Sequence, residues 1–156
     1  MSQKQLVTHP MTRERAAQAY PLVRELNGAG TLEEWLRFVD RHLGRGEEGG
    51  VIVCERGGYI RGLFGWEVRQ GVSDRRELLV RHFIVPGVLE PRAVVDALLD
   101  AVDQLAVRVK CVEIALELPM EAGQHPAFAA RGLVPGSIGL HRQLSEAQQR
   151  ERPSDA

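Results

Sequence analysis

The sequence predicts a single α/β domain, in which about four helices flank a central mixed β-sheet. Its 156 residues, 44% of them hydrophobic and 26% charged, suit one domain with a sizeable core. Hydrophobic residues recur with a helical period in some segments and alternate with polar residues in others. Short turns join the first strands, whereas a long helix precedes a later one, which predicts antiparallel and parallel pairs in one sheet.

The chain is predicted to begin with a short strand over residues 6–8 and a helix over residues 12–26. Thr12 has a side chain suited to cap this helix. Pro21 lies inside it and lacks the N–H that a helix interior needs, which predicts a kink or a late start.

A second helix is predicted to begin at Thr31 and to end at Gly44. Thr31 and Glu34 have the spacing of a capping box, in which each side chain accepts a hydrogen bond from the other residue's backbone. Trp35 lies on the apolar stripe of this helix. We interpret it, like Trp66 further on, as a packing residue rather than as part of a ligand platform.

From residue 49 the period becomes alternating, which predicts strands over residues 51–55, 59–69 and 77–85, joined by turns at 56–58 and 70–74. Gly62 and Gly65 inside the second strand indicate a β-bulge or a closely approaching backbone. The alternation assigns one face of this strand to Ile60, Phe64, Trp66 and Val68.

The most regular helical period covers residues 91–107. Its predicted core positions are Val94, Val95, Leu98, Leu99, Val102 and Leu105, and the aspartates 96, 100 and 103 fall on or beside its exposed side. An apolar strand over 109–118 follows, which predicts a right-handed crossover between parallel strands. A helix over 126–131 and a last strand over 138–144 complete a domain of residues 1–144. Residues 145–156 are a polar tail, either disordered or a frayed helix.

Charge and cysteine spacing exclude several classes of function. The net charge is −1, and without a basic excess or stripe we do not expect a nucleic-acid partner. Cys54 and Cys111 lie in separate apolar runs without metal-ligand spacing, so we expect free thiols and no metal site. No run approaches membrane-spanning length and the N-terminus has no signal-like core, so we expect a cytoplasmic protein that does not bind membranes.

The order of these elements, over roughly residues 5–144, resembles that of the GNAT N-acetyltransferase superfamily. In that family a pattern like V-x-P-x-x-R-G-x-G-x-G leads from the fourth strand into the third long helix, and it falls here on Val85–Val95 without a gap. The resemblance implies acetyl-CoA as cofactor, with its pyrophosphate held by backbone N–H groups at the helix start. Arg92, Ala93 and Val94 are the positions that would hold it.

The loop departs from the family pattern in its chemistry. Glu90 replaces the arginine, and Pro91, Ala93 and Val95 replace the three glycines, which normally let the backbone approach phosphate closely. Glu90 suits the positive end of the helix dipole but opposes an anionic cofactor. Arg92 is the nearby cation that could compensate.

A second family signature, like N-x-x-A-x-x-x-Y-x-x-x-G-F, aligns with Gly132-Leu133 as its final pair. Phe128 then takes the position of a tyrosine that often protonates the leaving thiolate in active relatives, and Glu121 takes the position of the asparagine. Phe128 cannot act as a general acid.

Candidate site residues lie on the predicted strand over 77–85. His82 and Glu77 are the candidate general bases, and the alternation of a strand predicts that they point to opposite faces. The resemblance implies that the backbone of Phe83, Ile84 and Val85 pairs with the pantetheine arm of the cofactor.

Two functions have similar support from the sequence, and a third has less. The first is acetyl transfer from acetyl-CoA to a small-molecule or protein amine. The second is a catalytically inactive structural, regulatory or ligand-binding module, which the changes at Glu90, Pro91, Val95 and Phe128 favour. The third is a scaffold or antitoxin-like partner that uses the exposed first helices. The family resemblance also implies a possible homodimer, because many members pair through their final strands.

Overall fold

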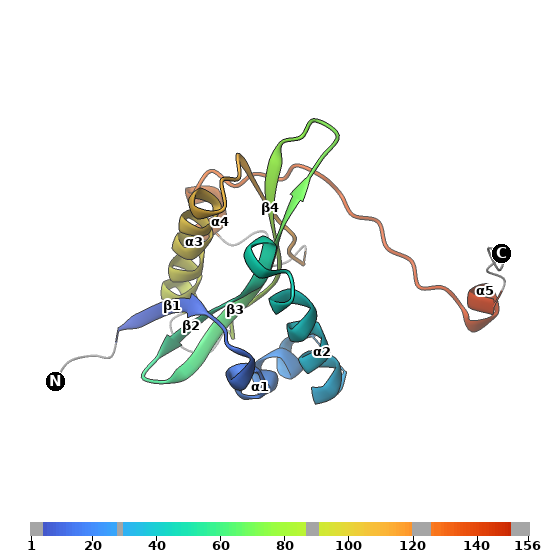
Figure 1. Ribbon diagram of the computed structural model, residues 1–156, viewed down its shortest axis with the longest axis horizontal. Coiled ribbons are helices and arrows are strands. Elements are labelled where there is room, and N and C mark those ends of the chain that lie inside the picture. Colours follow the sequence, from blue (N-terminus) through green and yellow to red (C-terminus); the bar gives the residue numbers. More distant parts are fainter. Residues whose placement is uncertain (1–4, 28–29, 87–90, 120–125, 151–156) are drawn as a thin grey trace.

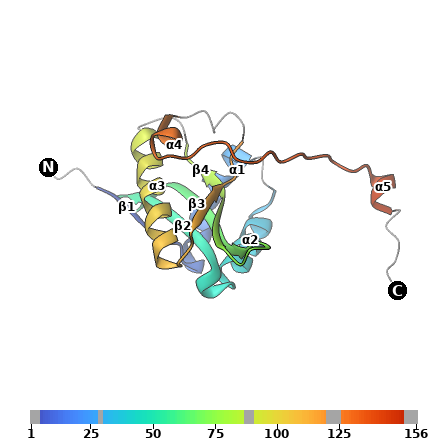
Figure 2. The ribbon, with the colours of Figure 1, turned by 90° about the horizontal axis from the view of Figure 1, so that it is seen from above.

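The computed structural model describes residues 5–27, 30–86, 91–119 and 126–150. A five-stranded sheet has the order β1-β2-β3-β4-β5. Helices cover both faces of the sheet, with α3 on one side and α2 on the other (Figures 1 and 2). The predicted α/β architecture with a central mixed sheet is confirmed.

The centre of the sheet is an antiparallel meander of three strands, β2 (Gly49–Arg56), β3 (Tyr59–Gln70) and β4 (Arg76–Ile84). Gly57 and Gly58 both have positive φ in the turn between β2 and β3, a conformation that glycine adopts without steric cost. Strand β1 (Leu6–Pro10) pairs antiparallel with β2 at one edge. At the other edge β5 (Glu113–Leu116) runs parallel to β4.

Helices α1 (Ala16–Asn27) and α2 (Leu32–Leu43) cover one face of the sheet. Helix α1 begins later than residue 12, because a 3₁₀ turn over Arg13–Arg15 precedes it and the Thr12 side chain makes no capping hydrogen bond. Pro21 nevertheless lies inside α1, so this start does not remove it from the helix as the predicted late start would. The capping box of α2 is confirmed. Thr31 Oγ1 accepts a hydrogen bond from the Glu34 N–H at 3.2 Å, and Glu34 Oε2 accepts one from the Thr31 N–H at 2.9 Å.

Helix α3 (Pro91–Arg108) covers the other face, together with the short helix α4 (Pro126–Ala130). All six predicted core positions of α3 are buried. The helix continues further than expected, since the N–H groups of Val109 and Cys111 bond to carbonyl oxygens within it. The prediction of a strand from residue 109 is therefore wrong at its start, and β5 is limited to four residues.

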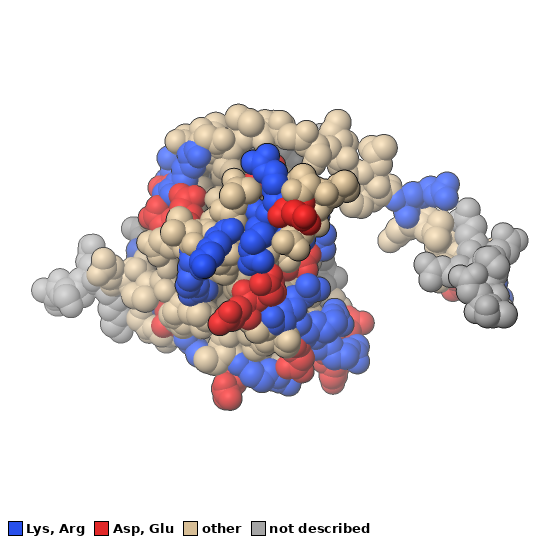
Figure 3. Space-filling view, turned by 45° about the horizontal axis from the view of Figure 1, so that its top comes forward, with Lys and Arg blue, Asp and Glu red and all other residues tan. Residues whose placement is uncertain are grey.

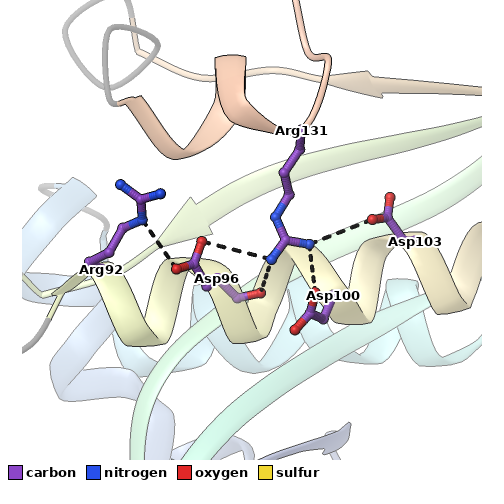
Figure 4. A network of polar contacts seen from close by, with 5 residues as sticks. All are labelled: Arg92, Asp96, Asp100, Asp103 and Arg131. Carbon is purple, nitrogen blue, oxygen red and sulfur yellow. Dashed lines mark hydrogen bonds and ion pairs between the residues drawn. The ribbon is translucent and has the colours of Figure 1, made fainter.

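A cluster of charged side chains joins α4 to α3 (Figure 4). Arg131, directly after α4, donates through Nη1 to Asp100 at 2.6 Å and through Nη2 to the Asp96 carbonyl oxygen at 3.2 Å. Asp103 lies 3.6 Å from Nη1. The three predicted surface aspartates of α3 thus surround one guanidinium group.

Two register shifts in the sheet confirm the bulge predicted from Gly62 and Gly65, one between Cys54 and Glu55 and one between Leu63 and Gly65. The shift changes which residues share a face of β3. Phe64 and Trp66 pack toward α3, whereas Ile60 packs with the α1–α2 side. The prediction that Ile60 shares the face of Phe64 is wrong, because the inserted residue interrupts the alternation.

The predicted last strand over residues 138–144 is wrong as well. In the described part of the chain these residues pair with no other strand. They belong to an extended segment that runs away from the domain to the short helix α5 (Glu146–Arg150) (Figures 1 and 2). Alternation in a sequence marks residues suited to a strand, but a strand forms only beside a hydrogen-bonding neighbour.

The remaining sequence expectations concern the surface and the thiols. Basic and acidic side chains are interspersed on the face drawn in Figure 3. None of the helices described could span a bilayer, because none is long and apolar enough. The described residues contain no cluster of three or more potential metal ligands. Both cysteines are free; Cys54 is buried, which raises the pKa of its thiol to about 11, and Cys111 is half-buried.

Candidate functional site

Strands β4 and β5 part before β4 ends. Their last paired residues are Val80 and Leu116, and Glu117 donates its N–H to the Val80 carbonyl oxygen at 2.9 Å. Strand β4 continues over residues 81–84, which no described residue of β5 pairs. Among the residues that the structure describes, this side of residues 81–84 has no strand partner, and an extended ligand could pair with a backbone edge of this kind.

The predicted junction between β4 and the long helix is confirmed at both ends, since β4 ends at Ile84 and α3 begins at Pro91. Residues 87–90 are outside the described residues, and with them the prediction about Glu90. The prediction about Glu121 also falls outside the described residues.

His82 occupies the bulge of β4. Its φ is +54°, and the register between β3 and β4 shifts here, with Gly65 opposite Arg81 and Leu63 opposite Ile84. The shift turns His82 toward α2, where its ring meets the Phe38 ring edge-on at 4.8 Å between centroids. Glu77 lies on this same face, because its neighbours Leu78 and Val80 alternate toward α3. The prediction that Glu77 and His82 point to opposite faces is wrong.

A cavity of about 220 Å³ lies between the first two helices and β4. Its lining consists of Val23, Gly30, Thr31, Glu34, Trp35, Phe38, His82 and Ile84. The walls are mostly aliphatic and aromatic, and the polar groups come from the start of α2 and from His82. Such a cavity suits the apolar body of a small molecule, with few groups to orient it.

Phe38, in the wall of this cavity, contacts two histidine rings, that of His82 in the wall and that of His42 behind it. His42, one turn further along α2, stacks on Phe38 at 4.1 Å between ring centroids. Its Nδ1 donates to the Phe38 carbonyl oxygen at 3.2 Å, because a carbonyl can only accept. Partial burial lowers the pKa of His42, and the same cause, helped by the nearby His42 and Arg81, lowers the pKa of His82. Both rings are therefore neutral at pH 7.

No family model and no curated protein sequence matches this chain, whereas solved structures do. Glucosamine-6-phosphate N-acetyltransferase from Arabidopsis thaliana superimposes with a TM-score of 0.75 at 13% identity, over 91% of this chain and 100% of that one. The aminoglycoside N-acetyltransferase AAC(6')-Iy in complex with CoA gives 0.74 at 15% identity, over 91% and 97%. A transcriptional regulator from Bacillus halodurans C-125 gives 0.76 at 12% identity, over 90% and 100%.

The chain has the GNAT acetyltransferase fold. The resemblance inferred from the order of elements is thereby confirmed at the level of architecture. Within a GNAT fold, the residues predicted to bind acetyl-CoA divide into two groups.

The first group has side chains in or beside the hydrophobic core, which leaves only its backbone groups for a ligand. Phe83 stacks with Phe64 and meets Phe128 edge-on, Ile84 is buried against α1 and α2, and Val94 packs on the α3 side. Val85, just after β4, is half-buried. These positions can offer main-chain groups to a ligand but no reactive side chain.

The second group lies on the exposed side of the start of α3. Ala93 is exposed, and Arg92 Nε donates to Asp96 at 3.1 Å, one turn along the helix. Arg92 is thus already paired with a carboxylate, which reduces the charge it could offer to a phosphate.

Glu77 lies outside the cavity. Its carboxylate accepts a hydrogen bond from Arg69 Nε at 2.6 Å, directly across β3 and β4. The pairing is consistent with a structural charge on the sheet rather than with a base. Phe128 is buried against Val95 and Leu99, so the aromatic ring at the expected tyrosine position is part of the core.

Sequence reasoning missed Phe38 and His42, which complete the surroundings of His82. The two residues are four apart, a spacing that places side chains on one face of a helix, and this was the available signal. Trp35 was interpreted as a packing residue. It is buried with its Nε1 donating to the Ala16 carbonyl oxygen at 2.7 Å, and it also forms part of the cavity wall.

Proposed function

We propose that this chain is an acyl-CoA-dependent N-acetyltransferase whose acceptor is a small amine with an apolar body. One arrangement supports the proposal above all others. A neutral histidine stands at an apolar cavity, next to the stretch of β4 that continues beyond its pairing with β5.

The donor would lie along residues 83–85, where the amide groups of a pantetheine chain could pair with the open backbone of β4 as an added strand would. Bound acetyl-CoA would supply an acyl carbonyl activated as a thioester. The start of α3, with Ala93 and Val94, would offer N–H groups to the pyrophosphate.

His82 would act as the general base. Its neutral ring takes a proton from the acceptor ammonium, and the free amine attacks the acyl carbon. The new C–N bond would replace the C–S bond of the thioester, the second proton of the amine would pass through water to the departing sulfur, and His82 would release its proton to solvent. No side-chain acid is required, because a thiolate is a good leaving group near neutral pH.

The lining of the cavity favours an acceptor amine with an apolar body. Val23, Trp35, Phe38 and Ile84 would enclose an aliphatic or aromatic group. Glu34 is the carboxylate at the cavity, and its Oε2 is already engaged by the Thr31 N–H. A polyamine or a sugar would leave its polar groups unpaired against these walls, which costs binding energy.

Purified protein with acetyl-CoA and a panel of amines tests the proposal, with acetylated product measured by mass spectrometry. We expect 2-phenylethylamine to react faster than spermidine or ethanolamine. His82→Gln should lower kcat/KM by about 10²- to 10⁴-fold, the usual contribution of a general base. His9→Gln, on β1 and outside the cavity lining, is the matched control and should retain activity.

The pH dependence of kcat/KM is a second test of His82 as the general base. The pKa of His82 is lowered from 6.5, so the ring loses its function as base only when the pH falls below that value. We expect kcat/KM to be level near pH 7 and to decline on the acid side. A profile unchanged by His82→Gln would exclude this role.

An inactive ligand-binding or regulatory module is the second candidate. It is favoured by the buried Phe128 in place of a hydroxyl-bearing residue and by the Arg92–Asp96 pair at the start of α3. Isothermal titration with acetyl-CoA and CoA separates the two candidates. Absence of heat with either compound at millimolar concentration would remove the enzyme proposal and leave the module.

A further inference from the structure

Four side chains of alternating charge cross the sheet beside the candidate site, on the face that α1 and α2 cover. Glu67 of β3 lies between two guanidinium groups, with Arg45 Nη1 3.0 Å from its Oε2 and Arg81 Nη1 3.9 Å from its Oε1. Arg81 belongs to β4, and its Nε lies 3.1 Å from Oε2 of Glu117, just after β5. These four residues, which we call the charge row, link the segment after α2 to the last three strands of the sheet.

The charge row ends where β4 and β5 part. Glu117 donates its N–H to the Val80 carbonyl oxygen at 2.9 Å, and its side chain reaches Arg81, the next residue of β4. An ion pair thus follows directly on the backbone pairing of the two strands. Beyond it, residues 82–84 of β4 have no partner among the described residues of β5. The Arg81–Glu117 pair therefore lies at the inner end of the opening between the strands.

Arg81 also precedes His82 in the bulge of β4. The register passes from Gly65 opposite Arg81 to Leu63 opposite Ile84, so that one residue of β3 faces two residues of β4. Arg81 reaches Glu67 and the His82 ring meets a ring of α2, which places both side chains on the same face of the sheet. An Arg81 side chain held at both ends therefore restricts the backbone that carries the His82 ring.

The rings of the site lie over the same part of β3. A Cβ atom at Gly65 would be 3.5 Å from Phe38 Cζ and 3.7 Å from His42 Cδ2. The same Cβ would be 3.6 Å from the Arg81 carbonyl oxygen. The Arg81 backbone and the two rings thus pack around one glycine, and a displacement of Arg81 would alter the contact between His82 and Phe38.

Burial distinguishes the charge row from an ordinary surface ion pair. The side chain of Glu67 is only 18% exposed, and Arg81 Nε is buried without an aligned hydrogen bond in the described part of the chain. The nearby charge of Glu117 is what compensates that Nε. Removing one partner would leave the other with little solvent around it, which is more costly than breaking an exposed pair.

We propose that Arg81 is a positioning residue: held between Glu67 and Glu117, it fixes the bulge that directs His82 to the cavity and the opening between β4 and β5. The inference rests on the function proposed above, in which His82 is the base and the donor lies beside that opening. Arg81 touches neither substrate. It acts on the reaction through the position of His82, where a small displacement lowers the rate.

The first test needs no substrate. In the wild-type chain, nuclear Overhauser effects should join ring protons of His82 and Phe38, whose centroids lie 4.8 Å apart. Arg81→Gln should abolish them and raise the pKa of His82, because the ring becomes less buried and loses a nearby positive charge. Arg69→Gln is the matched control. It breaks a 2.6 Å ion pair with Glu77 on the same face, at the far end of the β4–β5 pairing, and should leave the ring contact unchanged.

The second test measures kcat/KM for acetyl transfer. Arg81→Gln and Glu117→Gln should each lower it about 10- to 100-fold, the cost of a misplaced catalytic group. The two variants remove charges of opposite sign, so an effect of charge alone on His82 would change kcat/KM in opposite directions. Near-UV circular dichroism of the buried Trp35 and Trp66 verifies that each variant is folded.

The two tests separate this inference from the proposed function. A His82–Phe38 ring contact that persists in folded Arg81→Gln, or that is missing from the wild type, would overturn the inference whatever the activity. So would opposite changes of kcat/KM in the Arg81 and Glu117 variants. A wild-type chain that transfers no acetyl group, but whose ring contact is lost in Arg81→Gln, would refute the proposed function and support the positioning of His82 by Arg81.

Discussion

At the scale of single residues, Gly62 lies where three elements come closest. A Cβ atom placed there would be 2.9 Å from Val94 Cγ1, 3.0 Å from the Ile84 carbonyl oxygen and 3.0 Å from Leu98 Cδ1. The carbonyl belongs to the backbone of β4 and cannot rotate away. Because Gly62 has no side chain, α3 can pack closely on the sheet beside residues 83–85, where we propose that the acyl donor binds.

We predict that Gly62→Ala lowers the free energy of unfolding by about 1–3 kcal/mol, the usual cost of an overfilled core. Urea denaturation followed by tryptophan fluorescence measures it. Gly71→Ala is the matched control, because a Cβ there meets nothing within 4 Å. Equal midpoints for the two variants would mean that β3 and α3 have room to move apart.

His82 shows why the candidate site could be predicted only in part. The sequence identified the residue, its strand and the adjoining Phe83–Val85. It did not predict the side chain's direction, since that depends on a bulge opposite Gly65 and not on the alternation of β4 itself. The cavity wall escaped prediction for a related reason: Val23, Phe38 and His82 are distant in sequence, and only the packing of both first helices on β4 unites them.

At the scale of elements, α4 is a five-residue helix that needs outside support to stay in place. Phe128 supplies an apolar anchor, and Arg131 adds polar contacts to three aspartates and one carbonyl oxygen of α3. A guanidinium that is half-buried and shared among several acceptors contributes more than a single exposed pair.

We predict that Arg131→Gln lowers the free energy of unfolding by about 1 kcal/mol at low salt and by less at high salt, because ions screen the aspartates. Arg92→Gln, which also loses a contact with Asp96, is the matched control. The Arg92–Asp96 ion pair joins two exposed residues one helical turn apart, and it should contribute no more than about 0.5 kcal/mol to the free energy of unfolding. Urea titrations at two salt concentrations give both values, and equal losses for the two variants would contradict a special role for Arg131.

The elements themselves were largely predictable, because their signals are local. The Thr31–Glu34 capping box and the helical period of α3 depend only on residues that are near one another in the sequence, and both predictions are confirmed. The strand predicted over 138–144 shows the limit. Its alternation is real, but whether it pairs depends on a neighbour that the local sequence does not specify.

At the scale of the whole molecule, stability should decline from the centre of the sheet toward β1. Strand β3 has partners on both sides and lies between two helical layers, whereas β1 has one partner and is partly exposed. We predict that the amides of Leu63–Trp66 exchange slowest in native-state hydrogen exchange and that those of β1 open at lower free energy. Uniform protection across β1 and β3 would indicate that the sheet opens only as one unit.

The meander of β2, β3 and β4 occupies one unbroken stretch, Gly49–Ile84, joined by two tight turns. Closing such short loops costs little chain entropy, whereas β5 can dock only after all of α3 has been made. During synthesis the first four strands can therefore form a sheet before the residues of β5 have been added to the chain. At that stage β4, which carries His82, is the edge strand of the sheet, and the side of β4 that later pairs with β5 has no strand partner.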